Sequence, residues 1–436
     1  MIAQIVFVLL LVLASYWFSR NLSKIIRNIR LGRELNRNDH SGDRWMTMIR
    51  VALGQSKMVV RPVAGIMHIF VYVGFIIINF EVLEIIIDGV FGTHRFFASL
   101  GPVYNFLIAC FEVLALLVLV GVLVFLARRN ILKLKRFWMK EMTSWPRTDA
   151  NIILITEVLL MTAFLTMNAT DSILQSRGFG HYIQAGSFPV SSMFANVFSG
   201  MSSESLEMIE RFCWWFHIVG ILLFLNYVPY SKHFHIFLSF PNTYYSNLEQ
   251  KGRFTNMESV TREVKLMLDP SAVPPPTDPN AAPQRFGAKD VYDLTWKQLM
   301  DAYSCTECGR CTSSCPANQT GKLLSPRKIM MDTRDRLEEV GKNIDKQGKD
   351  FRDDKSLLNY ITEEELWACT SCNACTDACP VNIDPLSIIV DMRRYLVMEE
   401  SKVPQELAGM FSKIENNGAP WQFAQADRFK WAEEGA

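Results

Sequence analysis

The feature that most constrains the fold is the uneven distribution of apolar residues along the chain. Five stretches within the first 240 residues are long and apolar enough to cross the hydrocarbon of a membrane, which is about 30 Å thick and takes roughly 20 helical residues. The first stretch lacks a basic region before it and a small-residue cleavage site after it, which favours a retained helix over a signal peptide. The stretches run from about Ile2 to Arg20, Pro62 to Asp88, Gly101 to Ala127, Asn151 to Leu174, and Leu206 to Tyr230.

Basic residues are concentrated in two of the loops between these stretches. The segment from Arg20 to Arg61 carries ten Lys or Arg and the segment from Arg128 to Arg147 carries seven, whereas the other two loops hold only Arg95 and Arg177. The positive-inside rule places the basic loops in the cytoplasm. We therefore expect a multi-pass protein of the inner membrane, surrounded by lipid, with its N-terminus outside and its C-terminal part in the cytoplasm.

The rest of the chain is polar and charged, and it is rich in Pro and Cys. The balance of 45 basic and 44 acidic residues argues against a nucleic-acid partner. The run DPSAVPPPTDPNAAPQ is typical of an extended linker, and helical periodicity resumes near Lys289. The sequence predicts an all-α protein with a transmembrane domain at 1–240, a Pro-rich linker at 241–288, a helical cysteine-rich domain at 289–400 and a tail at 401–436.

Eight of the ten cysteines form two motifs with the same spacing. CTECGRCTSSCP, from Cys305, and CTSCNACTDACP, from Cys369, both match C-x2-C-x2-C-x3-C-P. In this ferredoxin pattern three close thiolates bind one 4Fe-4S cluster and the fourth binds the other cluster. Zinc is the alternative metal, but two tandem motifs that each end in Pro favour iron and sulfur. The expected ligands are Cys305, Cys308, Cys311 and Cys379 for the first cluster, and Cys369, Cys372, Cys375 and Cys315 for the second.

These thiolates need a reducing compartment, which agrees with the cytoplasmic side predicted from the basic loops. The remaining two cysteines, Cys110 and Cys213, are isolated within apolar stretches. Isolated cysteines of this kind behave as small apolar side chains, so we expect both in helix packing.

Histidines within the apolar stretches indicate a second kind of cofactor. His68 and His217 lie inside predicted spans, where a polar side chain is costly and a functional role is the default. His235 follows His217 by 18 residues, which is about five turns of a continuous helix, so both are expected on one face, unless Pro229 kinks the helix between them. We expect His68 and His235 to bind one haem b from opposite sides.

A second haem at His217 would need a further ligand, and the sequence is compatible with one haem or two. His94, just beyond the outer end of the second span, is the first candidate, and His181 is the next. His233 is expected to face solvent or lipid headgroups. The alternative is that these histidines only join helices through hydrogen bonds.

Two segments resemble known families. HIVGILLFLNYVPYSKHFHIFLSFP resembles the fifth helix of the respiratory nitrate reductase gamma subunit, and AGIMHIFVYVGF resembles the first histidine site of that family's second helix, although Ile78 stands where the family has a second histidine. The cysteine-rich part resembles the iron–sulfur part of heterodisulfide reductases and of the membrane-bound oxidoreductases that link electron-transfer flavoprotein to menaquinone. Those enzymes usually carry Cys-Cys-Gly motifs as well. None occurs here, so the resemblance implies that a separate iron–sulfur subunit holds that site.

The sequence thus predicts an oxidoreductase subunit that transfers electrons between a cytoplasmic donor and menaquinone through two 4Fe-4S clusters and haem b. The resemblance implies a soluble flavoprotein as donor, with the catalytic site for the soluble substrate on another chain. Buried acids could carry protons to the quinone or pair with polar neighbours; the candidates are Glu81, Glu84, Glu112 and Glu157. The alternatives are an electron-input subunit of a disulfide reductase and, from a different class, a redox sensor or assembly scaffold.

Overall fold

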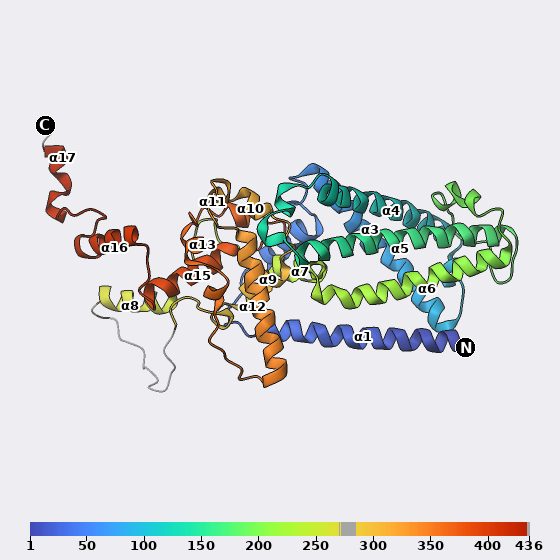
Figure 1. The fold of residues 1–436 in the computed structure, drawn as a ribbon, viewed down its shortest axis with the longest axis horizontal. Coiled ribbons are helices and arrows are strands. Elements are labelled where there is room, and N and C mark those ends of the chain that lie inside the picture. Colours follow the sequence, from blue (N-terminus) through green and yellow to red (C-terminus); the bar gives the residue numbers. More distant parts are fainter. Residues whose placement is uncertain (270, 272–284, 434–436) are drawn as a thin grey trace.

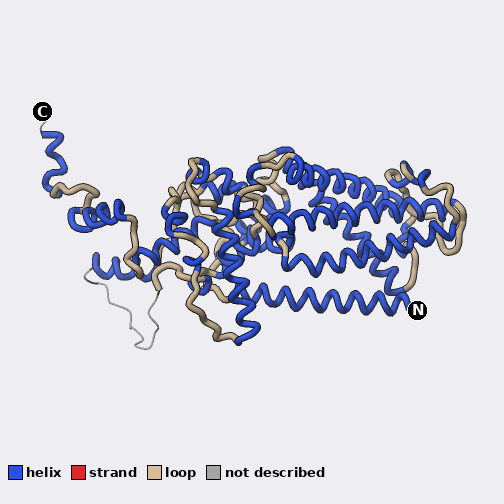
Figure 2. The backbone as a smooth tube through the Cα atoms, viewed as in Figure 1, coloured by secondary structure: helices blue, strands red, loops and turns tan. Residues whose placement is uncertain are grey.

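The protein is all-helical throughout the part that the computed structural model describes, which is residues 1–269, 271 and 285–433. Arg33 and Thr295 form an isolated bridge. No strand occurs in these residues (Figure 2). This confirms the predicted fold class. Most of the Pro-rich run predicted as a linker, residues 270 and 272–284, lies outside the described residues.

Five helices in the described part are long and apolar enough to cross a membrane, and they coincide with the five predicted spans. Three of them begin with Pro in the first turn, where the missing N–H breaks no helical hydrogen bond. The last of the five is capped by Ser202, whose hydroxyl accepts a hydrogen bond from the Ser205 N–H at 3.3 Å. The five are α1 (Ile2–Ile29), α3 (Pro62–Phe91), α4 (Pro102–Leu126), α5 (Trp145–Ser176) and α6 (Ser203–Tyr227).

Helices α3 to α6 pack in sequence as a bundle, and α1 lies along α6 and α3 (Figure 1). Close approach of α3 and α4 depends on small residues. A Cβ at Gly74 would overlap Val118, and one at Gly121 would lie 3.1 Å from the Met67 carbonyl oxygen. Small residues at helix contacts are typical of membrane bundles because dispersion packing, rather than the hydrophobic effect, holds such helices together.

The cysteine-rich domain follows the bundle at the end opposite the N-terminus (Figure 1). Its main helix, α12, begins after Ser325, which caps it, and ends before Gly348. Shorter helices carry or flank the cysteine motifs. They are α9 (Trp296–Ser304), α10 (Arg310–Ser314), α11 (Pro316–Gln319), α13 (Glu363–Trp367), α14 (Ala374–Ala378) and α15 (Pro385–Met398), whereas α12 spans Pro326–Gln347.

One hydrophobic core joins this domain to the membrane helices. Ile25 and Ile29 of α1 belong to the same buried cluster as Leu299 and Leu337 of the cysteine-rich domain. Helix α1 therefore continues nine residues past the predicted end of its span, because its last turns pack on the domain rather than in lipid. The Asn28 side chain donates a hydrogen bond to the Tyr303 hydroxyl at 2.9 Å and fixes this contact.

The remaining helices lie around the same end of the molecule. Helices α2 (Ser41–Met48) and α7 (His235–Tyr244) pack on each other, and α7 also packs on α9, so the predicted domain boundary at 240 falls within a helix. Helices α8 (Glu258–Leu268), α16 (Gln405–Asn417) and α17 (Lys430–Glu433) lie farthest from the bundle (Figure 1).

Candidate metal and haem sites

The four cysteines predicted for the first cluster line one small cavity. Cys305, Cys308 and Cys311 come from the first motif, and Cys379 comes from the end of the second. Helices α10 and α14, one in each motif, pack against each other and so bring Cys379 across to the first three cysteines. The fold therefore places Cys379 of the second motif beside three cysteines of the first, while the crossed ligation stays a prediction.

The second group is more exposed. Cys315 and Cys372 are close enough to Cys369 for their charges to act on its thiol. Cys369 is in turn close enough to act on the thiol of Cys375. Each group contains two buried cysteines, but Cys372 of the second group is exposed to solvent, whereas no cysteine of the first group is exposed. The second group is therefore the more accessible of the two.

The chemistry of the thiols fits a metal cluster. Burial raises the pKa of Cys305 to about 11 and the pKa of Cys379 to about 12, so cluster binding must displace protons from these sulfurs. Backbone N–H groups already point at the cysteine sulfurs: the Ile383 N–H donates to the Cys379 sulfur at 3.3 Å and the Ser371 N–H to the Cys369 sulfur at 3.4 Å. Such bonds stabilise thiolates and help to set cluster potentials.

No three His, Cys, Asp or Glu side chains converge on one metal-ion position anywhere in residues 1–269, 271 and 285–433. In a 4Fe-4S cluster the cysteines hold a multi-iron core rather than a single ion. The four sulfurs of the first group are accordingly arranged around a cavity.

A larger cavity, of about 420 Å³, lies within the bundle and reaches the first cysteine group. Three elements contribute histidines to its wall: α3, α6 and the segment at the start of α7. At its inner end Cys308 and Arg310 of the first motif are also part of the wall. The histidines that line it are His68, His217, His233 and His235.

Two of these histidines are oriented as metal-binding histidines are. The Nδ1 of His217 lies 3.0 Å from the Leu160 carbonyl oxygen, and the Nδ1 of His235 lies 3.1 Å from the Lys232 carbonyl oxygen. A carbonyl oxygen only accepts, so each Nδ1 carries the proton and each Nε2 keeps its lone pair. Metal-binding histidines almost always donate their second ring nitrogen in this way.

The other two histidines have ring nitrogens that no protein group satisfies. The Nδ1 of His68 and the Nε2 of His233 are buried without a hydrogen-bond partner in the described part of the chain. Buried polar atoms of this kind are rare and costly in native structures. Together with the two oriented histidines, they make a donor set that fits a haem iron.

The position of His233 corrects the expectation that it faces solvent or headgroups. Its ring lies next to that of His235, with centroids 5.5 Å apart, in the cavity wall. The continuous helix expected between His217 and His235 is also wrong. Helix α6 ends at Tyr227, and tight turns at Val228–Tyr230 and Lys232–Phe234 precede α7. Pro229 breaks the helix because it lacks the N–H and clashes with the preceding turn.

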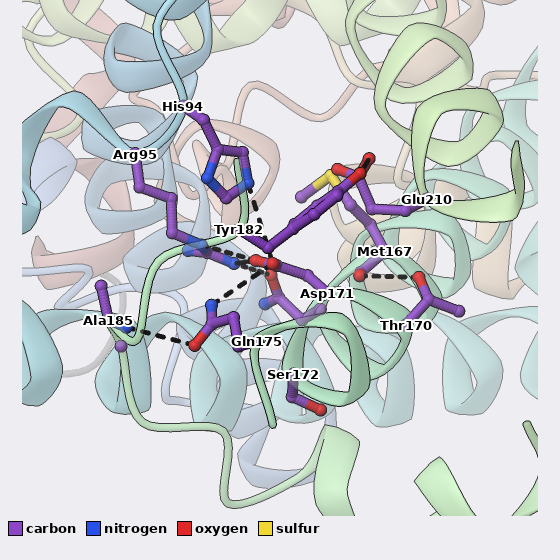
Figure 3. A network of polar contacts seen from close by, with 12 residues as sticks. His94, Arg95, Met167, Thr170, Asp171, Ser172, Gln175, Tyr182, Ala185 and Glu210 are labelled. Carbon is purple, nitrogen blue, oxygen red and sulfur yellow. Dashed lines mark hydrogen bonds and ion pairs between the residues drawn. The ribbon is translucent and has the colours of Figure 1, made fainter. Parts of the chain in front are cut away.

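His94 lies elsewhere, at the end of the bundle far from the cysteines. Its ring packs on His181 and Tyr182 at centroid distances of 5.2 and 5.0 Å, and its Nε2 lies 3.7 Å from an Asp171 oxygen (Figure 3). Neither His94 nor His181 is among the residues that line the bundle cavity. The structure therefore does not bring His94 to His217 as the second ligand expected from the sequence.

A polar network around Arg95 lies at this end of the bundle, far from the cysteines. Arg95 donates to Asp171 at 2.6 Å, to the Asn168 side-chain oxygen at 3.0 Å and to the Tyr104 hydroxyl at 3.1 Å, and Figure 3 shows its guanidinium pointing at Asp171. Tyr104 in turn donates to Glu84 at 2.8 Å. Because the members of this network satisfy one another, it has a structural role in joining α3, α4 and α5.

The four acids predicted as proton carriers divide into two kinds. Glu84 and Glu112 are fully engaged: the Phe97 N–H donates to Glu84 at 2.8 Å, and the Val190 N–H donates to Glu112 at 2.9 Å. Glu81 is buried with one oxygen unpartnered within the described residues, and Glu157 lines the cavity. Only this second kind remains available for proton transfer.

A buried ion pair that sequence reasoning missed joins the two sites. Lys232, in the turn before His233, pairs with Glu307, which lies between Cys305 and Cys308. Glu307 also accepts a hydrogen bond from Arg334 at 2.8 Å. Although burial raises the pKa of the Glu307 carboxyl, Lys232 and Arg334 hold it below its ordinary value. No local pattern predicts a pair between residues 75 positions apart.

Comparison with known proteins identifies the class. Residues 301–383 match the 4Fe-4S dicluster domain family. The chain is 30% identical to the probable iron-sulfur-binding oxidoreductase FadF of Bacillus subtilis (strain 168), over 99% of this chain and 61% of that protein. It is 29% identical to the EtfAB:quinone oxidoreductase of Syntrophomonas wolfei subsp. wolfei, over 92% of this chain and 55% of the relative.

A shorter match is to a heterodisulfide reductase. One subunit of the ferredoxin/F(420)H(2)-dependent CoB-CoM heterodisulfide reductase of Methanosarcina acetivorans is 31% identical over 27% of this chain and 60% of that relative. No solved structure matches. The chain spans less than two thirds of the length of its two long relatives.

The protein is therefore a membrane protein with a 4Fe-4S dicluster domain at its cysteine-rich end. It is related over nearly its whole length to iron–sulfur oxidoreductases. The resemblance to heterodisulfide reductases and to flavoprotein:quinone oxidoreductases that the cysteine motifs indicated is confirmed.

Proposed function

We propose that this chain is an oxidoreductase subunit that transfers electrons between a cytoplasmic donor and menaquinone in the inner membrane. One observation carries the proposal: a single cavity extends from His217 past His68 and His235 to Cys308 of the first cysteine group. Haem ligands and cluster ligands thus share one wall. Two 4Fe-4S clusters and haem b supply one-electron transfer when bound.

The cysteines divide into an outward-facing and a membrane-facing set. We assign the second cluster to Cys315, Cys369, Cys372 and Cys375 and the first cluster to Cys305, Cys308, Cys311 and Cys379. Cys372 is exposed, which makes the second group the side that a soluble partner can approach. Cys308 lines the bundle cavity, which makes the first group the side that faces the membrane.

The histidines at the inner end of the cavity hold haem b in this proposal. We assign one haem to His68 and His235, which lie on different elements and both line the cavity. The Nδ1–H bond of His235 leaves its Nε2 for the iron. His217 lines the same cavity, and the two-haem alternative would require it as a ligand. We propose that Glu157, in the same wall, provides or accepts protons for the quinone.

The partners in this proposal follow from the relatives. One long relative is named as an EtfAB:quinone oxidoreductase, which favours a soluble flavoprotein as donor. Because another relative is a heterodisulfide reductase subunit, we propose that a Cys-Cys-Gly iron–sulfur subunit passes electrons to the exposed second group. The heterodisulfide reductase match covers only 27% of this chain, so a quinone-linked function is favoured over the disulfide reductase alternative.

The basic loops support the proposed orientation, with the cysteine-rich domain in the cytoplasm. Arg61 of the first basic loop donates to the Ser313 hydroxyl at 2.9 Å, and the Arg136 carbonyl of the second accepts from Arg327 at 2.6 Å. Both basic loops thus lie on the cysteine side, which the positive-inside rule places in the cytoplasm.

Anaerobic purification of the chain from membranes tests the function. Iron, acid-labile sulfide and haem should all be present, and haem reduced with dithionite should be reoxidised by a water-soluble menaquinone analogue. Zinc in place of iron, or membranes without haem, would overturn the proposal. Haem content per chain in a His217→Ala variant separates the alternatives: a fall to half of the wild-type value would indicate two haems, and an unchanged value would indicate one.

A further inference from the structure

The two cysteine motifs differ at the first residue of their short helices. Helix α10 begins at Arg310, and α14 begins at Ala374, the residue that occupies the equivalent place between the second and third motif cysteines. Arg310 is buried, with 5% of its surface exposed. A buried guanidinium is costly unless it is bonded, so its surroundings indicate what it does.

Arg310 spans the space between the first cysteine group and the membrane bundle. Its guanidinium donates to the Lys57 carbonyl at 2.9 Å and to the Met58 carbonyl at 3.2 Å, both in the loop before α3. It lines the small cavity of the first group together with the four cysteines, and it also lines the bundle cavity that His68 and His235 line. These two carbonyls are neutral, so their hydrogen bonds leave the positive charge of Arg310 uncancelled.

Other cations gather on the same side of the first group. The Arg327 guanidinium packs on Gly309, where an added Cβ would lie 2.5 Å from its Nη1. Arg327 is paired with Glu141 at 2.7 Å. Arg136 packs next to Gly309 and retains its charge, although burial lowers its pKa to about 10. The carboxylate Glu307 is already neutralised by Lys232 and Arg334.

The charges around the second group are more evenly balanced. The positive charge of Arg393 stabilises the thiolate form of Cys369, whereas the negative charge of Asp384 destabilises the thiolate form of Cys375. Asp377, at the rim of the motif, pairs with Lys251 in solvent. The charges near the second group therefore approximately cancel, whereas those near the first leave an excess of positive charge.

Reduction of a cluster adds one negative charge, and nearby positive charge stabilises the reduced form. We propose that Arg310 raises the reduction potential of the first cluster above that of the second, and so directs electrons that arrive at the exposed group toward the haem cavity. This rests on the cluster assignment in the proposed function. Arg310 acts as a positioning and charge-supplying residue, not as a ligand.

Reciprocal variants of the purified full-length chain test this role. Arg310→Ala gives the first motif the residue of the second, and Ala374→Arg gives the second motif the residue of the first. Redox titration followed by electron paramagnetic resonance measures both potentials, with the two signals assigned in a Cys369→Ser variant. In wild type the first cluster should have the higher potential.

Arg310→Ala should shift the electron distribution about tenfold toward the second cluster, which corresponds to about 59 mV for one electron. Arg310→Lys should retain most of the wild-type difference, and Ala374→Arg should raise the second potential alone. If the Arg310→Ala variant does not retain the first cluster, the potential of the second cluster in Ala374→Arg tests the proposal instead. Unchanged potentials with both clusters present would overturn this proposal alone, whereas absence of iron would overturn the proposed function.

Discussion

The two cysteine motifs share their cysteines and spacing but differ at five of the seven positions between those cysteines. Glu307 of the first motif corresponds to Ser371 of the second, and Ser313 corresponds to Asp377. Glu307 bonds with Lys232 in the turn before α7, whereas the Ser371 N–H donates to the neighbouring Cys369 sulfur. The difference teaches that one copy of a repeated ligand pattern has been adapted for contact with the membrane helices.

The glycine of the first motif is a further position that is adapted to contacts outside the motif. Gly309 and Asn373 are equivalent and both adopt a left-handed backbone, with φ of 70° and 60°. Asn tolerates that conformation, so backbone geometry alone does not require glycine at 309. An added Cβ at Gly309 would lie 2.5 Å from the Arg327 guanidinium and 3.3 Å from the Arg136 Cβ. Contacts with α12 and with the second basic loop, not the turn itself, favour glycine here.

The largest effect is expected from a substitution that removes the ligand shared across the two motifs. Cys379→Ser alters the second motif but should remove the first cluster, because Cys379 lines the cavity with Cys305, Cys308 and Cys311. Iron should fall by about four of about eight atoms per chain. The paramagnetic spectrum should match that of Cys305→Ser. A spectrum that matches Cys375→Ser instead would mean that each motif binds its own cluster.

The next effect concerns haem. His68→Ala should abolish the haem assigned to His68 and His235 while both clusters remain, since His68 is not part of the buried core that surrounds the cysteines. Absorption spectroscopy of haem and iron analysis of the same sample measure both. His94→Ala is the matched control, because His94 packs on His181 and Tyr182 outside the cavity, and it should retain full haem content. Haem loss in the control alone would reverse the assignment.

A smaller effect is expected on the free energy of unfolding, where substitutions of Glu307 and Ser371 should differ. Glu307→Gln removes the counter-charge that Lys232 and Arg334 share and leaves them Asp149 at 3.8 Å and Asp335 at 3.4 Å, which should cost roughly 1.5–3 kcal/mol of unfolding free energy. Ser371→Ala should change it by less than about 0.5 kcal/mol. Thermal unfolding in detergent compares the two variants.

The stability that Glu307 contributes depends on pH, and the sign of that dependence is defined. Glu307 has a folded-state pKa below its ordinary value of 4.5, so its stabilisation is present above that pH and is lost as pH falls through the folded-state pKa. Glu307→Gln should remove this acid sensitivity, which unfolding measured across a pH series would show. Equal loss of stability on acidification in wild type and variant would contradict the role assigned to the ion pair.

The smallest effects lie at the rim of each motif. Arg61→Ala removes a hydrogen bond to Ser313, and Lys251→Ala removes an ion pair with Asp377 in which both side chains are more than half exposed. Exposed pairs contribute about 0–1 kcal/mol. Both variants should unfold within about 1 kcal/mol of wild type, with the Lys251 variant closer to it. A large loss in the Lys251 variant would show that the second motif is also anchored.

Local pattern was enough to predict the helices and the grouping of the cysteines. The five spans and the all-helical fold are confirmed, because apolar length and periodicity are properties of neighbouring residues. The cluster and haem ligands stay predictions, although the fold gathers Cys379 with the first motif and places His68, His217 and His235 in one cavity wall. His94, predicted from its position in the sequence, does not join them.

The sequence by itself determined which segments can enter lipid and which cysteines can share a cluster, since both depend on spacing along the chain. Only the tertiary structure decided that His233 turns inward after the break at Pro229, that Lys232 meets Glu307, and that Arg310 lies between the two cavities. The physical reason is that buried charges and ring orientations are set by partners distant in sequence, and no local periodicity encodes those partners.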